Sequence, residues 1–212
     1  MKKALDDIVV LDFTRYIAGP FATYLLGHMG ARIIKVEKAI VGEDFRLYPP
    51  FYNGESLAYP AYASNKKSLC MDLRNDRAKE ILLKLLPHVD IVVQNFRAGT
   101  IEKMGLDWET IHRINPRIIM ANNSGFGQYG PYSPGGNNSD HMGALAFVSA
   151  IMSALLQRDR TGEGQYLEVD MMSAVSSMFS PELAMYEATG RIEKTNDLAP
   201  CAYYKDKSGR FV

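Results

Sequence analysis

The residue best placed for covalent chemistry is Asp140, which stands where a glycine-rich loop meets an uncharged helix. The loop from Ser124 to Ser139 reads SGFGQYGPYSPGGNNS, and no charged residue occurs from Gly143 to Leu156. Glycine lets the backbone approach a ligand closely, and the free N–H groups of a helix start favour an anion. An ionised carboxylate there can attack an acyl carbon while N–H groups hold the oxyanion. The same pattern also fits a simple N-cap at Ser139 or Asp140.

Composition and charge are those of an ordinary globular chain. The 212 residues include 24 basic and 24 acidic side chains, so neither nucleic acid nor a membrane is expected as a partner. Cys70 and Cys201 are the only cysteines, which predicts no disulfide framework and no metal site. The N-terminus has acidic residues where a signal peptide would be apolar, and the longest uncharged run, 143–156, is too short to span a bilayer. A cytoplasmic protein is therefore expected.

Short apolar runs alternate with helical patterns along the whole chain. The expected strands are 8–13, 32–37, 68–73, 90–94, 117–122 and 166–169. The expected helices are 21–29, 77–86, 100–104, 108–113, 143–156 and 170–186. This alternation predicts an α/β domain with a mainly parallel sheet, in which ligands bind at the carboxyl ends of the strands. Segment 38–60, rich in proline, glycine and aromatic residues, is expected to be an irregular excursion over the surface.

The usual nucleotide-binding motifs do not occur. The first strand–helix turn, Ala18-Gly19-Pro20, lacks the spaced glycines of a dinucleotide fingerprint. Glu37 closes the second strand where a ribose-binding acid would stand, but without the glycines a surface or salt-bridged residue is the better interpretation. P-loop, nucleophile-elbow and zinc-protease motifs do not occur either.

Five sequence blocks, in this order, resemble the family III CoA-transferases, the formyl-CoA and carnitine-CoA transferase group that also contains the α-methylacyl-CoA racemases. The blocks lie within 18–37, 65–73, 95–106, 115–131 and 158–165. Together they cover nearly the whole chain. The resemblance implies a Rossmann-like large domain with helices on both faces of the sheet and an interlocked homodimer. It also implies acyl-CoA and a carboxylic acid as substrates, with no permanently bound cofactor.

The chemistry that this resemblance implies is CoA transfer through an aspartate, which forms a mixed anhydride and then a CoA thioester. Asp140 matches the position of that aspartate, because the same apolar helix leads into the block at 158–165. Two alternatives remain open. One is an α-methylacyl-CoA racemase on the same fold, and the other is an inactive fragment that binds CoA.

The positions that match the family's CoA contacts are Ile17, Ala18, Lys38, Met71, Asp72, Leu73, Arg74, Asn95, Phe96, Arg97 and Lys103. The basic residues of this set would balance the phosphates of CoA, while Ile17 and Phe96 would cover its apolar faces. Singly, a solvated surface explains each cation equally well, and core packing explains each apolar residue. His141 has two interpretations as well: it orients the acyl group, or it bonds to backbone at the helix start.

The chain departs from the family pattern in two places. Pro131 and Asp140 are separated by only eight residues, where the family has a few tens. The family also continues into a second, smaller domain. We therefore expect residues 1–190 to form the CoA-binding large domain, shortened between about 131 and 140. Residues 191–212 are expected to begin a linker to a second domain that is absent.

Overall fold

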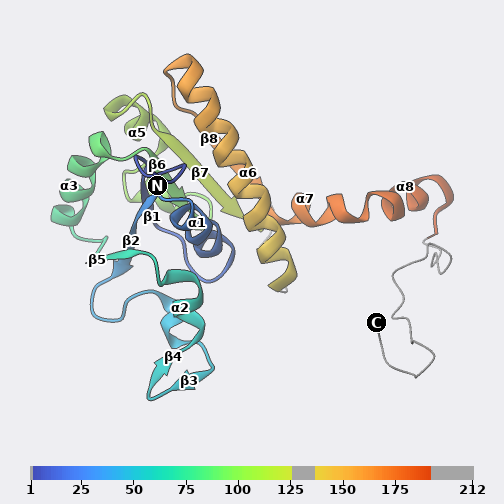
Figure 1. Cartoon of the computed structure of the whole chain (residues 1–212), viewed down its shortest axis with the longest axis horizontal. Helices are drawn as coiled ribbons and strands as arrows, with labels where there is room; N and C mark the ends of the chain where they lie inside the picture. Colours follow the sequence, from blue (N-terminus) through green and yellow to red (C-terminus); the bar gives the residue numbers. More distant parts are fainter. Residues whose placement is uncertain (1, 126–136, 192–212) are drawn as a thin grey trace. The chain divides into compact units, whose positions relative to one another are not determined.

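The structure is a computed structural model of the chain, and it describes residues 2–125 and 137–191 (Figure 1). The chain divides into two units, Met1–Val175 and Ser176–Val212, and each is described by itself. The predicted domain boundary at residue 190 falls within the second unit. Most of the predicted glycine-rich loop, 126–136, and the predicted linker from 192 onward lie outside the described residues.

The first unit is built on one parallel sheet with the strand order β5-β2-β1-β6-β7-β8. Its strands are β1 (Val9–Asp12), β2 (Arg32–Lys38), β5 (Lys67–Met71), β6 (Ile91–Gln94), β7 (Ile119–Ser124) and β8 (Tyr166–Asp170). In this register Val10 lies between Ile33 on one side and Ile91 on the other. The order is that of a doubly wound sheet, in which the crevice for ligands opens between the two central strands, here β1 and β6. The predicted Rossmann-like fold is confirmed.

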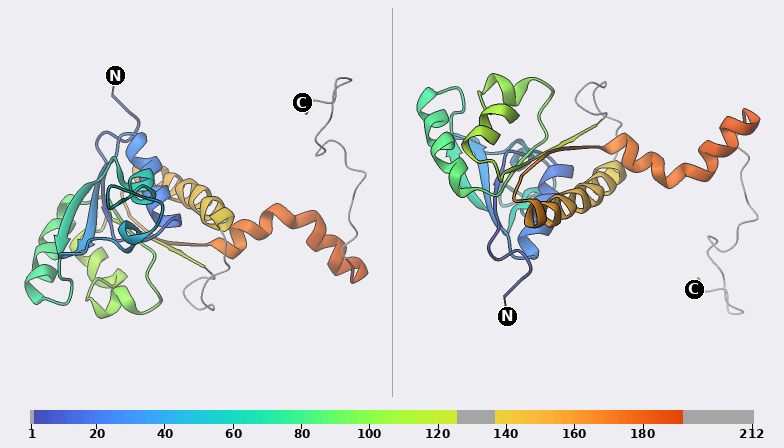
Figure 2. Two further views of the ribbon diagram at one scale, coloured as in Figure 1. Left: turned by 90° about the horizontal axis from the view of Figure 1, so that it is seen from below. Right: turned by 90° about the horizontal axis from the view of Figure 1, so that it is seen from above.

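Helices cover both faces of this sheet (Figures 1 and 2). One face carries α1 (Ala18–His28) and α6 (Asn137–Thr161), and the other carries α3 (Asp76–Leu85), α4 (Thr100–Lys103) and α5 (Trp108–Ile114). Neighbouring side chains of a strand point to opposite faces, so Val10 packs with Leu26 and Phe147, whereas Leu11 packs with Leu82 and Ile111. Because both faces are covered, the central strand β6 is buried along its whole length.

Helix α6 packs along the sheet through the buried side chains of Ala144, Phe147 and Ile151. By length and composition α6 could cross a membrane, but a core helix of a soluble protein meets the same criterion, and 44% of its apolar window is buried. The helix begins at Asn137, which places Asp140 in its first turn. An N-cap at Ser139 or Asp140 is therefore wrong.

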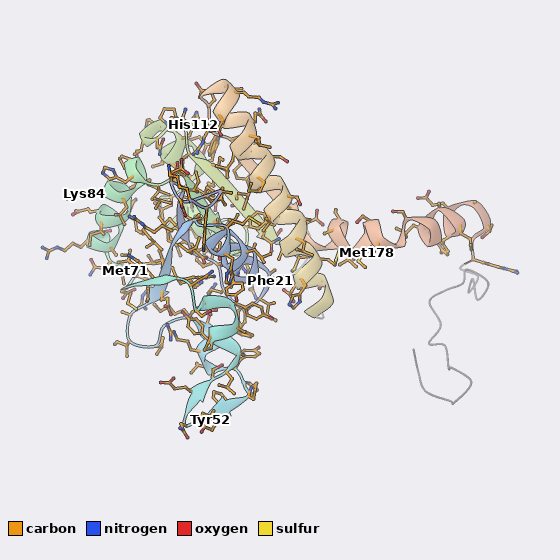
Figure 3. All side chains as sticks on the ribbon, in the orientation of Figure 1. Phe21, Tyr52, Met71, Lys84, His112 and Met178 are labelled. Carbon is orange, nitrogen blue, oxygen red and sulfur yellow. The ribbon has the colours of Figure 1, made fainter. Side chains whose placement is uncertain are left out.

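The excursion between β2 and β5 contains more regular structure than expected. It holds η1 (Asp44–Leu47), the hairpin of β3 (Phe51–Tyr52) and β4 (Glu55–Ser56), and α2 (Ala58–Ala63). Tyr52 lies in the hairpin (Figure 3). The buried Glu37 carboxylate holds the excursion, because it accepts bonds from Arg46 Nε at 2.8 Å, Arg46 Nη2 at 2.9 Å and the Tyr59 hydroxyl at 3.1 Å. Glu37 is therefore salt-bridged, and that prediction is confirmed.

The predicted single helix over 170–186 is wrong, since the structure has α7 (Met171–Ser176), η3 (Ser177–Phe179) and α8 (Ser180–Thr189). Pro181 supplies no N–H for the carbonyl of Ser177, four residues earlier. The Ser180 hydroxyl donates to that carbonyl instead, at 2.8 Å. Such local side-chain bonding competes with a regular helix.

Candidate active site

The Asp140 carboxyl lies at the start of α1. Its side chain is half-buried in the first turn of α6, and it accepts a hydrogen bond from the backbone N–H of Ala18, the first residue of α1. The N-cap residue of α1 is Ile17, which has no side chain that can cap the helix. Asp140 therefore satisfies one of the free N–H groups of α1. Because α1 follows β1 along the chain, the carboxyl lies at the carboxyl edge of the sheet.

Burial raises the pKa of the Asp140 carboxyl above its ordinary value. The hydrogen bond from Ala18 and the charge of His141 both lower this pKa, but burial is the larger effect. This rise in pKa is opposite to the effect of a helix start alone, which favours the anion and so lowers the pKa. Nucleophilicity generally rises with basicity, so an Asp140 carboxylate with a raised pKa is a stronger nucleophile than a fully solvated one.

Aromatic side chains surround His141, the next residue. Its Nε2 lies 3.3 Å from the hydroxyl of Tyr62 on α2. The Phe21 ring of α1, labelled in Figure 3, has its centroid 4.9 Å from the imidazole, and Phe45 lies 6.0 Å from Tyr62. Sequence reasoning noted aromatic residues in this region but did not single out Tyr62, because only the fold brings α2 to the start of α6.

Two of the predicted CoA-binding residues that follow β6 make contacts within the protein. Phe96 is 7% exposed and packs at 6.4 Å from Phe13 between ring centroids, with the Arg15 guanidinium 4.9 Å above its ring. Core packing therefore accounts for Phe96. The Asn95 side chain bonds to the backbone of Arg15. Arg97 is exposed.

Two of the predicted cations already have acidic partners. Lys38, at the end of β2, is exposed and pairs with Asp44, which also pairs with Arg15 at 3.1 Å. Arg74 forms a bidentate pair with Asp72, and both of its bonds are 2.9 Å long. The Asp72 carboxylate partly offsets the charge of Arg74, so Arg74 attracts a phosphate less strongly than an arginine without an acidic partner.

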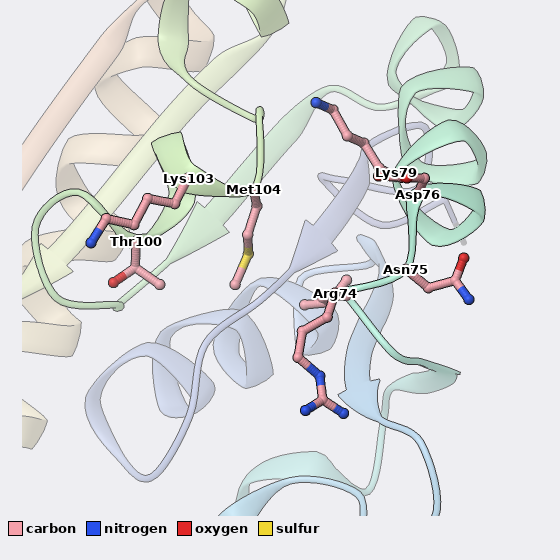
Figure 4. A pocket seen from close by; sticks show the side chains of 8 residues that line it. Arg74, Asn75, Asp76, Lys79, Thr100, Lys103 and Met104 are labelled. Atoms are coloured by element: carbon pink, nitrogen blue, oxygen red, sulfur yellow. The ribbon is translucent and has the colours of Figure 1, made fainter.

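A cavity of about 340 Å³ lies between the β5–α3 connection and α4 (Figure 4). Its lining comprises Leu73, Arg74, Asn75, Asp76, Lys79, Thr100, Lys103 and Met104. It brings together three of the predicted CoA-binding residues, namely Leu73, Arg74 and Lys103. Among the described residues, those that line the cavity do not include Lys38, Asn95 or Asp140.

Lys79 is a cation of this cavity that sequence reasoning missed. It lies on α3, where a lysine is normally explained by a solvated helix face. Gly105, with φ of +70°, faces the Lys79 ammonium so closely that a Cβ at position 105 would collide with it. With Arg74 and Lys103, Lys79 gives the cavity three cations against the single carboxylate of Asp76, a balance that favours an anionic ligand.

The fold and the site define a doubly wound α/β protein in which one half-buried carboxyl meets a helix start at the sheet's carboxyl edge. The chain belongs to CoA-transferase family III, whose model matches residues 5–135 and 132–212. The two matches meet where the sequence predicted a shortened segment.

Named relatives agree with this family. The chain is 36% identical over 228 residues to a succinyl-CoA–D-citramalate CoA-transferase of Chloroflexus aurantiacus, covering 93% of this chain and 57% of the relative. It is 33% identical over 244 residues to the succinyl-CoA:glutarate CoA-transferase of Mus musculus, covering 99% and 56%. That alignment is longer than the 212 residues of this chain, so the mouse enzyme has residues without a counterpart here. The chain spans little more than half the length of these relatives.

A solved structure supports the fold as well. The CAIB/BAIF family protein from Brucella suis superposes with a TM-score of 0.83 at 28% identity, covering 91% of this chain and 60% of that one. The similarity therefore extends over most of the residues described above.

Proposed function

We propose that the complete protein transfers CoA from an acyl-CoA to a carboxylic acid, with Asp140 as the nucleophile. The observation that carries the proposal is the half-buried Asp140 carboxyl, bonded to the Ala18 N–H at the carboxyl edge of the sheet. Family membership supports CoA as the transferred group. The relatives named above are CoA-transferases for citramalate and glutarate, which supports a small organic acid as the acceptor.

Each proposed step forms one bond to an acyl carbon and breaks another. The Asp140 carboxylate attacks the thioester carbonyl, the C–S bond breaks, and CoA leaves as a thiolate, so that a mixed anhydride of Asp140 and the donor acyl group remains. The thiolate then attacks the Asp140 carbonyl and releases the donor acid, which leaves an aspartyl-CoA thioester. The acceptor carboxylate attacks this thioester, the C–S bond breaks, and CoA thiolate leaves behind a second mixed anhydride. The thiolate then attacks the acceptor carbonyl of that anhydride, which gives the acceptor acyl-CoA and frees the Asp140 carboxylate. The N–H groups at the start of α1 stabilise the oxyanion of each tetrahedral intermediate.

The CoA molecule is elongated, with the phosphates of its nucleotide at one end and the thiol at the other. The cavity with Arg74, Lys79 and Lys103 suits the phosphate end, since cations stabilise phosphates through charge-assisted hydrogen bonds. Ile17 and Ala18 lie beside Asp140 and suit the thioester end. Lys38 and Arg97, both exposed, are proposed to contact the part between them.

The test is chemical trapping. Incubation with an acyl-CoA and hydroxylamine should convert Asp140 to a hydroxamate that mass spectrometry detects, and Asp140→Asn should abolish it. Asp159→Asn, a change of an exposed acid on the same helix, is the matched control and should leave trapping intact. An active, full-length protein with unmodified Asp140 would contradict the proposal. Exchange of the α-proton with solvent deuterium in the absence of an acceptor acid would identify a racemase instead.

The second candidate is a chain that binds CoA without turnover. The observation that favours it is the length, because the chain covers 57% of the citramalate enzyme and the acyl pocket would then be incomplete. Isothermal titration with CoA together with a turnover assay separates the two functions. Binding without turnover in this chain, with turnover in a protein that has the missing segments, would assign the loss to those segments.

We also propose that the full-length protein is an interlocked homodimer in the cytoplasm. The excursion supports an interface, because several large apolar side chains there are exposed, among them Ile40, Val41, Leu47, Phe51, Tyr52 and Leu57. Such a contiguous segment is more typical of a covered surface than of a free one. Light scattering on the purified full-length protein should give the mass of a dimer, and a monomer would contradict the proposal.

A further inference from the structure

Two lysines and an aspartate are buried together where β1 ends beside the middle of β2. Asp12 is the last residue of β1, Lys35 lies in β2, and Lys66 comes immediately before β5. Their side chains are at most 1% exposed. Taking an ammonium out of water costs several kcal/mol unless hydrogen bonds and an opposite charge compensate, so the contacts of this cluster decide what it does.

Two of the three contacts of Lys66 lie on the first two turns of α1. Its Nζ lies 2.9 Å from the carbonyl oxygen of Pro20, 2.7 Å from the hydroxyl of Thr23 and 3.0 Å from Asp12 Oδ2. An ammonium has three N–H donors, and these partners use all three. Lys66 therefore has no donor left for a substrate, which excludes it as a catalytic acid.

The other members of the cluster hold the loop that leads into α1. Lys35 Nζ donates to the carbonyl of Thr14 and lies 3.8 Å from Asp12 Oδ1. The same Asp12 oxygen accepts the backbone N–H and the hydroxyl of Thr14, at 2.8 and 2.6 Å. Hydrogen bonds thus hold the chain on both sides of Ala18, at Thr14 before it and at Pro20 and Thr23 after it.

Hydrogen bonds fix the orientation of the groups that they join, whereas apolar packing alone does not. The N–H of Ala18 is the group that bonds to Asp140, and its direction follows from the orientation of the first turn of α1. A displacement of about 1 Å in a catalytic group costs roughly 100-fold in rate. The buried cluster is thus connected to the reacting carboxyl through one turn of helix.

We propose that Lys66 is a positioning residue, which fixes the first turn of α1 through Pro20 and Thr23 so that the Ala18 N–H points at the Asp140 carboxyl. This inference rests on the proposed function for its effect on turnover, but the geometry that it describes exists whether or not Asp140 is the nucleophile. The effect on geometry is therefore measured separately from turnover.

The test uses two variants, Thr23→Val and Lys66→Met, in the full-length protein. The first readout is the pKa of the Asp140 carboxyl, measured by NMR with ¹³C-labelled aspartate and assigned with Asp140→Asn. Weakening a hydrogen bond to the ionised form disfavours that form, so this pKa should rise in both variants. The second readout is turnover, where kcat should fall roughly 10-fold or more while KM for the acyl-CoA changes little.

The control is Asn65→Ala. Asn65 Nδ2 donates to the Tyr24 carbonyl at 2.9 Å, so it contacts the same helix away from its first turn. This variant should loosen α1 without moving the pKa of Asp140. If Lys66→Met does not fold, Thr23→Val, which removes the hydroxyl that accepts from Lys66 and donates to Asp12 at 2.7 Å, decides whether this cluster positions the first turn of α1.

Each outcome is decisive. A folded Thr23→Val protein with the pKa of Asp140 unchanged overturns the inference. A raised pKa with unchanged kcat supports the positioning and contradicts Asp140 as the nucleophile. An equal rise in the pKa of Asp140 in Asn65→Ala would show a general loosening of α1, and it would also overturn the role assigned to Lys66.

Discussion

Arg15 and Asn95 exchange two hydrogen bonds across the central crevice of the sheet. The Arg15 N–H donates to Asn95 Oδ1 at 2.8 Å, and Asn95 Nδ2 donates to the Arg15 carbonyl at 2.8 Å. Arg15 follows β1 and Asn95 follows β6, the neighbouring strands at which the strand order reverses. The side chain of Asn95 therefore joins the two loops that border the crevice.

Replacing Asn95 by aspartate tests this role. Asn95→Asp keeps the acceptor oxygen but places a second oxygen against the Arg15 carbonyl, so one bond is lost and the loops separate. Losing a part-buried hydrogen-bond donor of this kind costs about 1 kcal/mol of stability, and the affinity for CoA should fall as well. Denaturant unfolding and isothermal titration with CoA measure the two effects.

The matched control for this change is Asn115→Asp. Asn115 Nδ2 donates to the carbonyls of Leu86 and Val89, at 3.0 and 2.9 Å, at the opposite edge of the sheet. Stability should fall by a similar amount, while CoA affinity should not change. Equal affinity losses in both variants would show that stability alone controls binding.

Gly105 is expected to matter for ligand binding through Lys79. Gly105→Ala forces an alanine to adopt φ of +70° and pushes the Lys79 ammonium out of its place, which should weaken CoA binding. Gly54→Ala is the control, because Gly54 has φ of +82° and nothing within 4 Å of an added Cβ. Both variants should lose about 1–2 kcal/mol from the backbone strain, but only Gly105→Ala should lose CoA affinity. Unchanged affinity in Gly105→Ala would remove Lys79 from the binding site.

Acid should destabilise the protein through Asp12 and Glu37. Hydrogen bonds and nearby cations outweigh burial and lower the pKa of Asp12 from 3.8, and that of Glu37 from 4.5, to about 2 in each case. A folded pKa below the unfolded one means that stability is present above the unfolded value and lost as pH falls toward 2. In Glu37→Gln the unfolding free energy should therefore depend less on pH between 4.5 and 2. The difference is at most roughly 3 kcal/mol, reduced by solvent around Arg46.

The matched comparison for this acid titration is Glu80→Gln, a change of an exposed glutamate on α3. Its pH dependence should follow that of the parent protein. A parallel pH dependence in the parent and Glu37→Gln would instead show that the Glu37–Arg46 pair contributes nothing to acid sensitivity.

Most of the strands and helices could be predicted because each is encoded by neighbouring residues. The run from Ile8 to Phe13 predicts β1, and Asn75, which stands just before the helical pattern over 77–86, caps α3, where its side chain accepts the Arg77 N–H at 2.9 Å. Two errors had local signals that could have corrected them. Pro181 signals the break between η3 and α8, and Asn53-Gly54 is a typical hairpin turn.

The site was harder to predict because its contacts join distant parts of the chain. The position of Asp140 follows from the loop and the helix beside it, but its bond to Ala18 depends on α1 and α6 packing together. Lys66 and Asp12 are 54 residues apart, and only the strand order brings them together. In sequence Lys66 is one of two consecutive lysines, and nothing local shows that it is buried while Lys67 is exposed.

Turnover should decline above about pH 8, where Lys66 loses its proton. Burial lowers the pKa of Lys66 from 10.5 to about 8, although Asp12 raises it. The charged groups around the ammonium are Asp12 from β1, Lys35 from β2 and Glu43 before η1. A neutral amine loses the ion pair with Asp12 and one of its three donors, so the first turn of α1 loosens and kcat should fall several-fold by pH 9.

Over the same pH range the free energy of unfolding should rise while kcat falls. The two measurements therefore separate a loss of positioning from a loss of folded protein. The folded pKa of Lys66 lies below its unfolded value, so between pH 8 and 10.5 the unfolded chain binds more protons, and this group makes the folded state more stable as pH rises. The decline in kcat above pH 8 should disappear in Lys66→Met and persist in Lys67→Met, which changes the exposed neighbour. A decline that persists in a folded Lys66→Met protein would assign the titration to another group, because Lys66 is then no longer there to lose a proton.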